Sequence, residues 1–290
     1  MLAIGVDPKI VRMIEVLYDE TECAVVIDGQ LTDWFAIKIG VRQGCLLSPA
    51  LFNIFIEFVM MELKNLDASL HLNDSLSLDI KYADDTALLS TIFDKLKLST
   101  SQLESACKKW GMKINGAKCK IISPASDNIM IDGIEVEKVP EFCFLRSVVP
   151  NCPADVKRRI ALASSAFGRL KKAVWNKRTI SSTLKIRLYK ALILPIAVYA
   201  SETWTLKTED TRKLEVFEMR CLRAILGVSL RDRYTNERVR NTLQITETIT
   251  EVIKKKRLRW FGHVTRKPPS TWCTKLTSRT SQIRDPEGDP

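Results

Sequence analysis

Residues 76–90 read LSLDIKYADDTALLS, where two adjacent aspartates, Asp84 and Asp85, interrupt a stretch of mostly apolar, small and hydroxyl-bearing residues. The flanking runs predict two strands joined by a tight turn that carries both aspartates. Two ionised carboxylates side by side repel each other unless a cation lies beside them. Because Mg²⁺ prefers oxygen ligands and phosphate groups, this pattern favours metal-assisted phosphoryl transfer. The alternative is an ordinary surface turn, in which aspartate is common.

The composition is that of a globular protein. The chain has 290 residues, of which 46% are hydrophobic, enough for one large domain or two moderate ones. It contains no run of about 18 apolar residues, so we expect no membrane span. The N-terminus lacks the features of a signal peptide, and the eight cysteines are scattered. We therefore expect an intracellular protein, nuclear or cytoplasmic and not secreted, with reduced thiols.

Charge is unevenly distributed along the chain. Residues 1–150 contain 15 Lys/Arg and 21 Asp/Glu, a net of −6, whereas residues 151–290 contain 30 and 13, a net of +17. The basic half predicts a polyanion partner; a well-solvated helical surface is the alternative. Its densest stretch, KKKRLRW, supplies the candidate nucleic-acid-binding residues Lys254, Lys255, Lys256, Arg257, Arg259 and Trp260. Trp260 and Phe261 either stack on bases or pack into a core.

Hydrophobic periodicity predicts an α+β fold. Before Pro150, helices are expected after Asp7-Pro8 and Ser48-Pro49 and over residues 93–112, with a hairpin at Asp132-Gly133. The helix after Ser48-Pro49 is apolar almost all round, so we expect it to be buried. Further strands are expected in ECAVVIDGQ and DWFAIKIGV, joined at Asp28-Gly29. After Pro150 every predicted element is a helix, over residues 155–175, 181–201, 208–227 and 250–266, the second bent or broken before Pro195.

A second motif lies ahead of the paired aspartates. GVRQGCLLSPALFN (40–53) places a Gln-Gly turn before a Ser-Pro helix start, and WGMKINGAKCKII (110–122) and FCFLRSVV (142–149) come later in the chain. With the YADD hairpin, these segments resemble the palm of a reverse transcriptase, most closely that of non-long-terminal-repeat (LINE-type) retrotransposons. RCLRAILGVSLRDRYTNERVR and RLRWFGHVTR are similar to the region C-terminal to the polymerase core in such elements. The resemblance spans about residues 5–267.

The resemblance implies a role for each motif. Asp84 and Asp85 would bind Mg²⁺ for two-metal nucleotidyl transfer, and Lys118 would face the nucleotide's phosphates as a catalytic acid, unless it is an ordinary surface lysine. The residues implied at the incoming nucleotide and template are Gln43, Gly44, Ser48, Pro49, Asn53, Tyr82 and Ala83. The implied primer grip is Phe142, Phe144 and Leu145, for which ordinary strand packing is the alternative. The implied partners are an RNA template, a DNA primer and deoxynucleotides, with no membrane; the oligomeric state is left open.

The chain also departs from the family's pattern. The family carries a third catalytic carboxylate on an earlier strand, and no aspartate here occupies such a position. Arg146 stands where the family has a glycine, and a positive φ there would strain an arginine. We therefore expect a C-terminal fragment of a retrotransposon reverse transcriptase, without the fingers and the first carboxylate motif. Such a fragment would have a weak or incomplete Mg²⁺ site and be inactive alone; the alternative function is a non-specific nucleic-acid-binding module acting through the basic helical half.

These motifs also predict a domain plan. The first part is a partial reverse-transcriptase palm (1–122), a small antiparallel sheet with helices packed against it. The other parts are a primer-grip-like hairpin and connection (123–150), a helical thumb-like region (151–200), a basic helical C-terminal region (201–267) and a polar, disordered tail (268–290).

Overall fold

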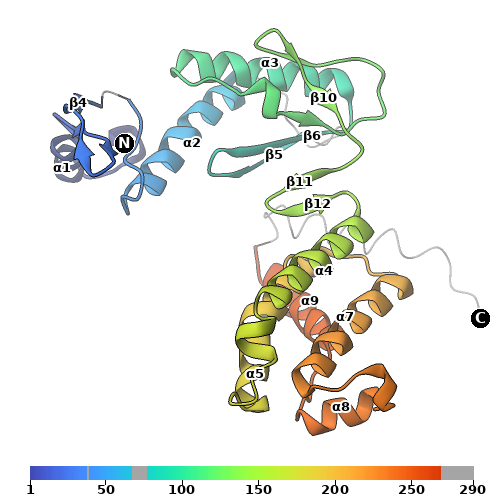
Figure 1. Ribbon diagram of the computed structural model, residues 1–290. Coiled ribbons are helices and arrows are strands. Elements are labelled where there is room, and N and C mark those ends of the chain that lie inside the picture. The colour runs from blue at the N-terminus through green and yellow to red at the C-terminus, as the bar shows by residue number, and fades with distance from the viewer. Residues whose placement is uncertain (38, 67–76, 269–290) are drawn as a thin grey trace, which may run out of the picture. The chain divides into compact units, whose positions relative to one another are not determined.

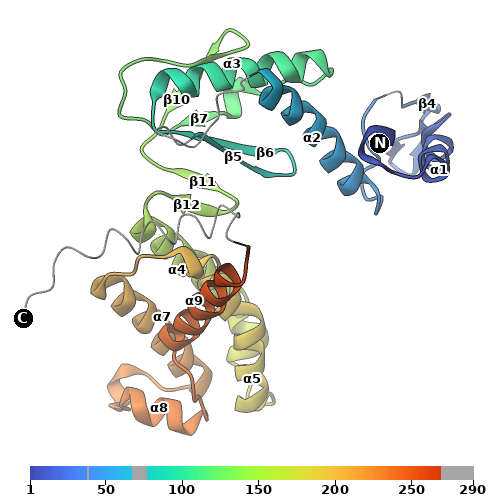
Figure 2. The same ribbon diagram turned by 180° about the vertical axis from the view of Figure 1, so that it is seen from behind.

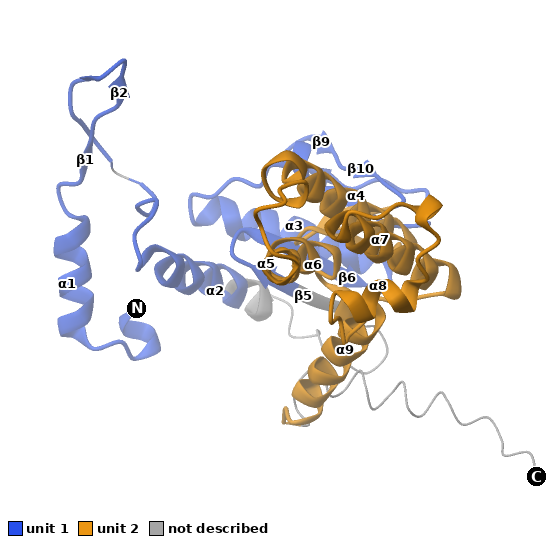
Figure 3. Cartoon of the chain, turned by 60° about the horizontal axis from the view of Figure 1, so that its bottom comes forward, with its two compact units in different colours: residues 1–140 blue, residues 141–290 orange. Residues whose placement is uncertain are grey.

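The computed structural model describes residues 1–37, 39–66 and 77–268. The chain falls into two compact units, residues 1–140 and residues 141–290, which Figure 3 colours separately. The expected α+β class is confirmed, because unit 1 mixes helices with short strands and the described part of unit 2 is mainly helical. Most of the expected tail, residues 269–290, lies outside the described residues.

Unit 1 begins with a short 3-10 turn, η1 (Leu2–Ile4), and the helix α1 (Pro8–Tyr18). Asp7 caps α1 as predicted, since its side chain accepts a hydrogen bond from the N–H of Lys9 at 2.7 Å. Four two-residue strands come next: β1 (Glu22–Cys23), β2 (Val26–Ile27), β3 (Gln30–Leu31) and β4 (Phe35–Ala36). The predicted turn at Asp28-Gly29 joins β2 to β3, and β1 pairs with β4.

The middle of unit 1 is built from two helices and one hairpin (Figures 1 and 2): α2 (Ser48–Leu66), β5 (Ser77–Tyr82), β6 (Asp85–Ser90) and α3 (Phe93–Lys109). Val59 and Met60 of α2 pack with Ala106 and Cys107 of α3 in a small core. The prediction that α2 is buried almost all round is wrong. Among its described side chains only Ser48, Val59 and Met60 are buried, because α3 covers it along one side.

The last part of unit 1 holds very short strands around a second small core: η2 (Gly116–Lys118), β7 (Lys120–Ile121), β8 (Met130–Ile131), β9 (Ile134–Glu135) and β10 (Glu137–Lys138). The predicted Asp132-Gly133 turn joins β8 to β9, with φ values of 51° and 74°. The small antiparallel sheet expected within residues 1–122 is not formed as one sheet: the described residues of both units contain six separate two-stranded pairs, of which β10 with β7 is parallel. Most of these strands are only two or three residues long, too short to join into one sheet.

Unit 2 opens with a hairpin, β11 (Phe142–Phe144) and β12 (Ser147–Val149), and every later element in its described part is helical, as predicted. The longer helices are α4 (Cys152–Arg169), α7 (Thr208–Leu226) and α9 (Ile249–Thr265). The shorter elements are η3 (Lys171–Trp175), α5 (Ser182–Leu188), η4 (Tyr189–Ile193), α6 (Leu194–Ala197), η5 (Ser201–Thr203), η6 (Leu230–Asp232) and α8 (Asn236–Thr242). The predicted irregularity before Pro195 is confirmed, because a π-helical turn, η4, separates α5 from α6.

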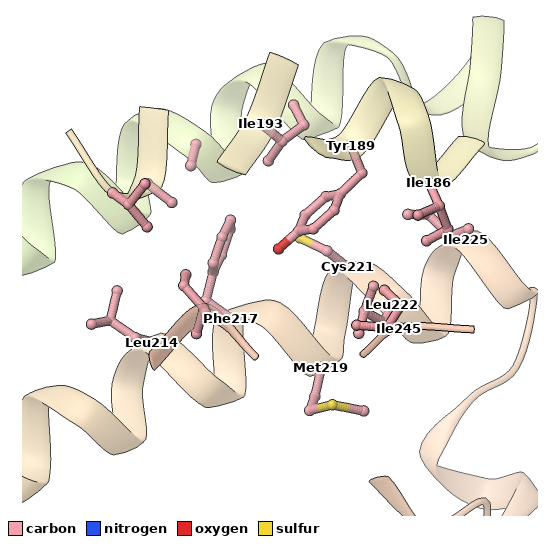
Figure 4. Close-up of a cluster of buried hydrophobic side chains, with 14 of the residues drawn as sticks. Ile186, Tyr189, Ile193, Leu214, Phe217, Met219, Cys221, Leu222, Ile225 and Ile245 are labelled. Carbon is pink, nitrogen blue, oxygen red and sulfur yellow. The ribbon is translucent and has the colours of Figure 1, made fainter. Parts of the chain in front are cut away.

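One large apolar core holds the helices of unit 2 together (Figure 4). The apolar stripe of α7, formed by Leu214, Phe217, Cys221 and Ile225, is buried in this core, and Phe217 and Cys221 lie beside Tyr189 of η4. Burial raises the pKa of the Cys221 thiol to about 12, so this side chain behaves as a small apolar group. In the described part of the chain, no helix is both long and apolar enough to cross a bilayer.

Candidate functional site

The paired aspartates lie at the tip of a regular hairpin. The strands β5 and β6 pair in antiparallel register over six residues each, from Ser77 with Ser90 to Tyr82 with Asp85. Ala83 and Asp84 form the two-residue turn, and Ala83 has a φ of 53°. Tyr82, Ala83 and both aspartates are exposed. The predicted strand–turn–strand is therefore confirmed, and it holds both carboxylates in solvent.

The two aspartates at this tip have no charged partner among the described residues. Neither Asp84 nor Asp85 has a hydrogen bond or ion pair with another residue that the structure describes. The nearest lysine in sequence, Lys81, instead pairs with Glu57 of α2 at 3.1 Å. No cation from the described part of the chain therefore lies against the two carboxylates, and a bound metal ion would relieve their repulsion. In the described residues, no group of three or more His, Cys, Asp or Glu side chains could hold a metal.

The Gln-Gly turn lies against the start of α2. The buried hydroxyl of Ser48 donates to the carbonyl of Arg42 at 2.5 Å, closing the turn onto the helix. Gly44 has a φ of 81°, which favours glycine, and Gln43 is exposed in the same turn. Pro49 and Asn53 are exposed on the first turns of α2. The turn therefore presents Gln43 to solvent, while Ser48 has a structural role as well.

Arg42 is a residue that the sequence interpretation missed. Its Nη2 donates to the carbonyl of Leu17 at 2.5 Å and to the hydroxyl of Thr21 at 2.7 Å. Its guanidinium also lies 5.4 Å from the ring centroid of Tyr18, whose hydroxyl is 3.3 Å from that of Ser48. Arg42 therefore ties the turn to the end of α1. The only sequence signal was an arginine placed directly before the Gln-Gly pair.

Lys118 ends the short turn η2 and is exposed. The side chain of Asn115 accepts a hydrogen bond from the Lys118 N–H at 3.3 Å. Gly116 is buried, and a Cβ there would lie 3.0 Å from the carbonyl oxygen of Ile131. The Asn115 hydrogen bond and the close packing of Gly116 therefore fix the position of the Lys118 backbone. Within the described residues, no hydrogen bond or ion pair joins Lys118 or Gln43 to the paired aspartates.

The three predicted primer-grip residues lie on the β11–β12 hairpin of unit 2. Phe142 is 37% exposed, while Phe144 and Leu145 are half-buried. The hairpin turn consists of Leu145 and Arg146, with φ values of 46° and 65°. The positive φ expected at Arg146 is thus confirmed. The side chains of Phe142, Phe144 and Leu145 are therefore partly packed and partly accessible to solvent.

The basic stretch of α9 is partly neutralised. Lys255 forms an ion pair with Glu247, and Lys256 pairs with Glu202 at 2.8 Å. Lys254, Arg257 and Arg259 are exposed, with no ion pair to another described residue. Trp260 is 44% exposed and Phe261 is 54% exposed, so neither lies in the core formed by the described residues. The aromatic and basic side chains therefore share an accessible stretch in the middle of α9.

A longer basic run was not singled out from the sequence. Between Asp155 and Glu202 the chain has eleven Lys and Arg residues and no Asp or Glu. Three of them are engaged: Arg158 and Arg159 with a carbonyl of the β11–β12 hairpin, and buried Lys185 with the carbonyl of Trp175 at 2.8 Å. The exposed ones are Lys157, Arg169, Lys171, Lys172, Lys177, Arg178, Arg187 and Lys190. Counting acids along the sequence would have found this run.

Comparisons with known proteins agree on one family. A family model described as reverse transcriptase (RNA-dependent DNA polymerase) matches residues 1–149. A transposon-derived protein of Caenorhabditis elegans is 22% identical over 218 residues, which is 69% of this chain and 75% of that protein. The RNA-directed DNA polymerase from mobile element jockey of Drosophila funebris is 24% identical over 235 residues, which is 76% of this chain and 25% of that protein.

A further relative belongs to another mobile element. The retrovirus-related Pol polyprotein from type-1 retrotransposable element R2 of Popillia japonica is 24% identical over 255 residues, or 83% of this chain and 41% of that protein. The chain thus spans about a quarter of the jockey polymerase and about two fifths of the R2 polyprotein.

Proposed function

Because this chain belongs to the reverse transcriptase (RNA-dependent DNA polymerase) family, and to the branch found in non-long-terminal-repeat retrotransposons, we propose that its YADD hairpin serves RNA-directed DNA synthesis. The observation that carries this proposal is the exposed carboxylate pair at the hairpin tip, to which no described residue contributes a cation. A carboxylate pair left open in this way suits a divalent cation brought in with a phosphate substrate.

Asp84 and Asp85 would hold the divalent ion in this proposal. Their oxygen donors fit Mg²⁺, which commonly takes one or two protein carboxylates together with substrate phosphates. When bound, the ion would supply electrostatic stabilisation of the charge on the phosphoryl group in transfer. Lys118 would bind the nucleotide's phosphates, and the turn at Gln43 and Gly44 would contact the nucleotide and template. Ser48, through its bond to the turn, would keep that contact in place.

The two units take different parts in this proposal. Residues 1–122 would form a partial palm around the nucleotide, and the β11–β12 hairpin would bear on the primer strand through Phe142, Phe144 and Leu145. Residues 151–200 would act as a thumb-like region along the template and primer, followed by a basic C-terminal region over residues 201–267. The family match over residues 1–149 and the helical make-up of the rest support this division.

Metal binding tests the role of the carboxylates directly. We would titrate Mn²⁺, a paramagnetic substitute for Mg²⁺, into the full chain and count bound ions by electron paramagnetic resonance. The double variant Asp84→Asn with Asp85→Asn should lose one bound ion. A matched control, Asp28→Asn with Asp33→Asn, removes the same charge from exposed positions around the β2–β3 hairpin and should lose none. Equal Mn²⁺ binding by the wild type and the Asp84/Asp85 variant would refute the proposed metal site.

The expected inactivity of the isolated chain stays a prediction. Primer extension on an RNA template with Mg²⁺ and deoxynucleotides tests it. No extension by the wild-type chain would agree with the prediction. Extension that is present in the wild type and absent in Asp84→Asn would contradict the prediction, and it would support the proposed role of Asp84.

Nucleic-acid binding through unit 2 is a second candidate function. It is favoured by the acid-free run between Asp155 and Glu202, whose eight exposed basic side chains form no ion pair within the described residues. The part of this run around η3 and α5 lies at the end of unit 2 away from the β11–β12 hairpin (Figures 1 and 2). Such a surface attracts phosphate backbones by releasing counterions, so binding by the full chain should weaken steeply as salt rises.

A further inference from the structure

Asp155 connects the β11–β12 hairpin to α4 by one buried carboxylate. The residue lies in the first turn of α4 and is 1% exposed. Its Oδ1 accepts a hydrogen bond from the N–H of Val148 at 3.0 Å, and its Oδ2 accepts from the hydroxyl of Ser147 at 2.9 Å. Trp204 Nε1 donates to the same Oδ2, also at 2.9 Å. Two of these three donors belong to β12, so the carboxylate ties that strand to the helix.

The turn of the same hairpin is held through its carbonyl groups. Arg158 Nη1 donates to the carbonyl of Arg146 at 2.7 Å, and Arg159 Nη2 donates to the same oxygen. The hydroxyl of Tyr199 donates to the carbonyl of Leu145 at 3.1 Å, and the Arg159 guanidinium lies 4.2 Å from the Tyr199 ring centroid. These contacts use main-chain atoms of the turn, so the side chains of Leu145 and Arg146 are left for other contacts.

The hairpin depends on this support for its conformation. Both turn residues have positive φ, which is costly for residues other than glycine. Its strands have only three residues each, and an isolated two-stranded hairpin is at best marginally stable in water. The orientation of the hairpin in unit 2 is therefore set by α4 and by Tyr199 and Trp204.

We propose that Asp155 is a positioning residue for the primer strand, which holds the β11–β12 hairpin in the one orientation that presents Phe142 and the turn to a primer end. This proposal rests on the proposed function of the hairpin. Asp155 is too deeply buried to touch the nucleic acid, so it acts through β12. Arg159 supports it by approaching Asp155 Oδ1 at 3.7 Å and by binding the turn carbonyl.

Asp155→Asn breaks the connection with little change in size. The amide keeps one acceptor oxygen and replaces the other with an NH₂ donor. That donor then faces either the N–H of Val148 or the indole N–H of Trp204, neither of which can accept, so at least one of the three hydrogen bonds is lost. The matched control is Glu218→Gln, another buried carboxylate of unit 2. Glu218 bonds the N–H of Ile249 at 2.8 Å and Arg240 at 3.0 Å, away from the hairpin.

The readout is a ratio of affinities measured on the full chain. We would compare binding of an RNA–DNA hybrid with a recessed primer 3′ end to that of a blunt hybrid of equal length, by fluorescence anisotropy. The wild type should bind the recessed hybrid severalfold more tightly. Asp155→Asn should bind both with nearly equal affinity, and Glu218→Gln should keep the wild-type ratio. General destabilisation would weaken binding of both hybrids alike, so it would not change the ratio.

Hydrogen–deuterium exchange separates the ways in which the proposal can fail. Asp155→Asn should speed exchange in residues 141–150 relative to the wild type and to Glu218→Gln. Faster exchange with an unchanged affinity ratio would show that Asp155 holds the hairpin without positioning a primer, and would overturn the proposal. A wild type without preference for the recessed hybrid would refute the primer role of the hairpin itself, and the proposal with it.

Discussion

At the scale of single residues, the turn of each motif hairpin contains a residue other than glycine in a backbone conformation that favours glycine. Ala83 in the YADD turn has a φ of 53°, and Arg146 in the β11–β12 turn has a φ of 65°. The sequence indicated the strain at Arg146, because the resembling family has glycine there. It gave no sign that Arg158 and Arg159 bind the carbonyl of Arg146 from a helix turn twelve or more residues away. Such a contact has no local pattern in the sequence.

Arg146→Gly should stabilise the fold. A left-handed conformation costs an L-residue about 1–2 kcal/mol, and glycine removes this strain. The greater freedom of glycine in the unfolded chain offsets about 0.4–1 kcal/mol of that gain in stability. We expect the free energy of unfolding to rise by about 0.5–1 kcal/mol in urea titrations, since glycine keeps the carbonyl that both arginines bind. Arg146→Ala is the control, because it removes the side chain but keeps the strain. Equal gains in both variants would assign the effect to the arginine charge.

Gly116→Ala should destabilise unit 1. The added Cβ would lie 3.0 Å from the carbonyl oxygen of Ile131 and 3.3 Å from the Cβ of Ile134, so the backbone must shift. Overpacking of this kind costs about 1–3 kcal/mol, measurable by thermal unfolding. Gly168→Ala on α4 is the matched control, because its Cβ would meet nothing within 4 Å. It should stabilise slightly, and a loss as large as that at Gly116 would count against the packing argument.

At the scale of elements, the sequence predicted those whose pattern is local. The YADD hairpin has alternating strands and a two-residue turn, and α7 has a clear apolar stripe with a glycine stop at Gly227. The seven-residue α8 was missed because Val239 is the only one of its residues that is buried. One buried position gives no recognisable hydrophobic periodicity in the sequence. The burial of α2 was overestimated because an apolar sequence does not say how many partners a helix has. The bond from Trp204 to Asp155 spans 49 residues and lies beyond any local rule.

The N-terminal cap of α9 should make its stability depend on pH. Thr248 and Glu251 bond each other's main chain reciprocally, and the N–H of Thr248 holds the pKa of the Glu251 carboxyl below its ordinary value of 4.5. A lowered folded-state pKa means that the stabilisation is present above the ordinary pKa and is lost as pH falls through the folded-state pKa. Glu251→Ala should therefore lower the unfolding temperature at neutral pH, with a difference that narrows in acid.

Glu209→Ala provides the control for this pH dependence. Glu209 also lies in the first turn of a helix, α7, but is exposed and makes no side-chain hydrogen bond with another described residue. Its replacement should have a smaller effect at neutral pH, from the helix dipole alone. A pH profile of the same size for both variants would show that the capping bond of Glu251 contributes nothing of its own.

At the scale of the whole molecule, the charge of a half chain does not say which residues can bind a polyanion. The basic half carries a net of +17, and its densest stretch in sequence is the start of KKKRLRW. The structure places Glu247 and Glu202 against two of those lysines, which had seemed free in the sequence. The acid-free run has no carboxylate of its own, so its exposed charges keep their full effect. The structure therefore makes the basic surface around η3 and α5 a stronger candidate for nucleic-acid binding than that of α9.

Salt-dependent RNA binding by the full chain distinguishes these two surfaces. Replacing Lys171, Lys172, Lys177 and Arg178 with alanine removes four exposed charges that pair with no described residue. Replacing Lys254, Lys255, Lys256 and Arg257 removes four charges of which two are already paired with glutamates. Each phosphate contact contributes about 0.7 to the slope of log K against log salt for single strands, so the slope should flatten by up to about 2.8 in the first variant and about 1.4 in the second. Asp84→Asn, in the acidic half, should leave the slope unchanged. A larger loss in the α9 variant would mean that Glu202 and Glu247 release their lysines when RNA binds, and that the densest stretch of the sequence is the true contact.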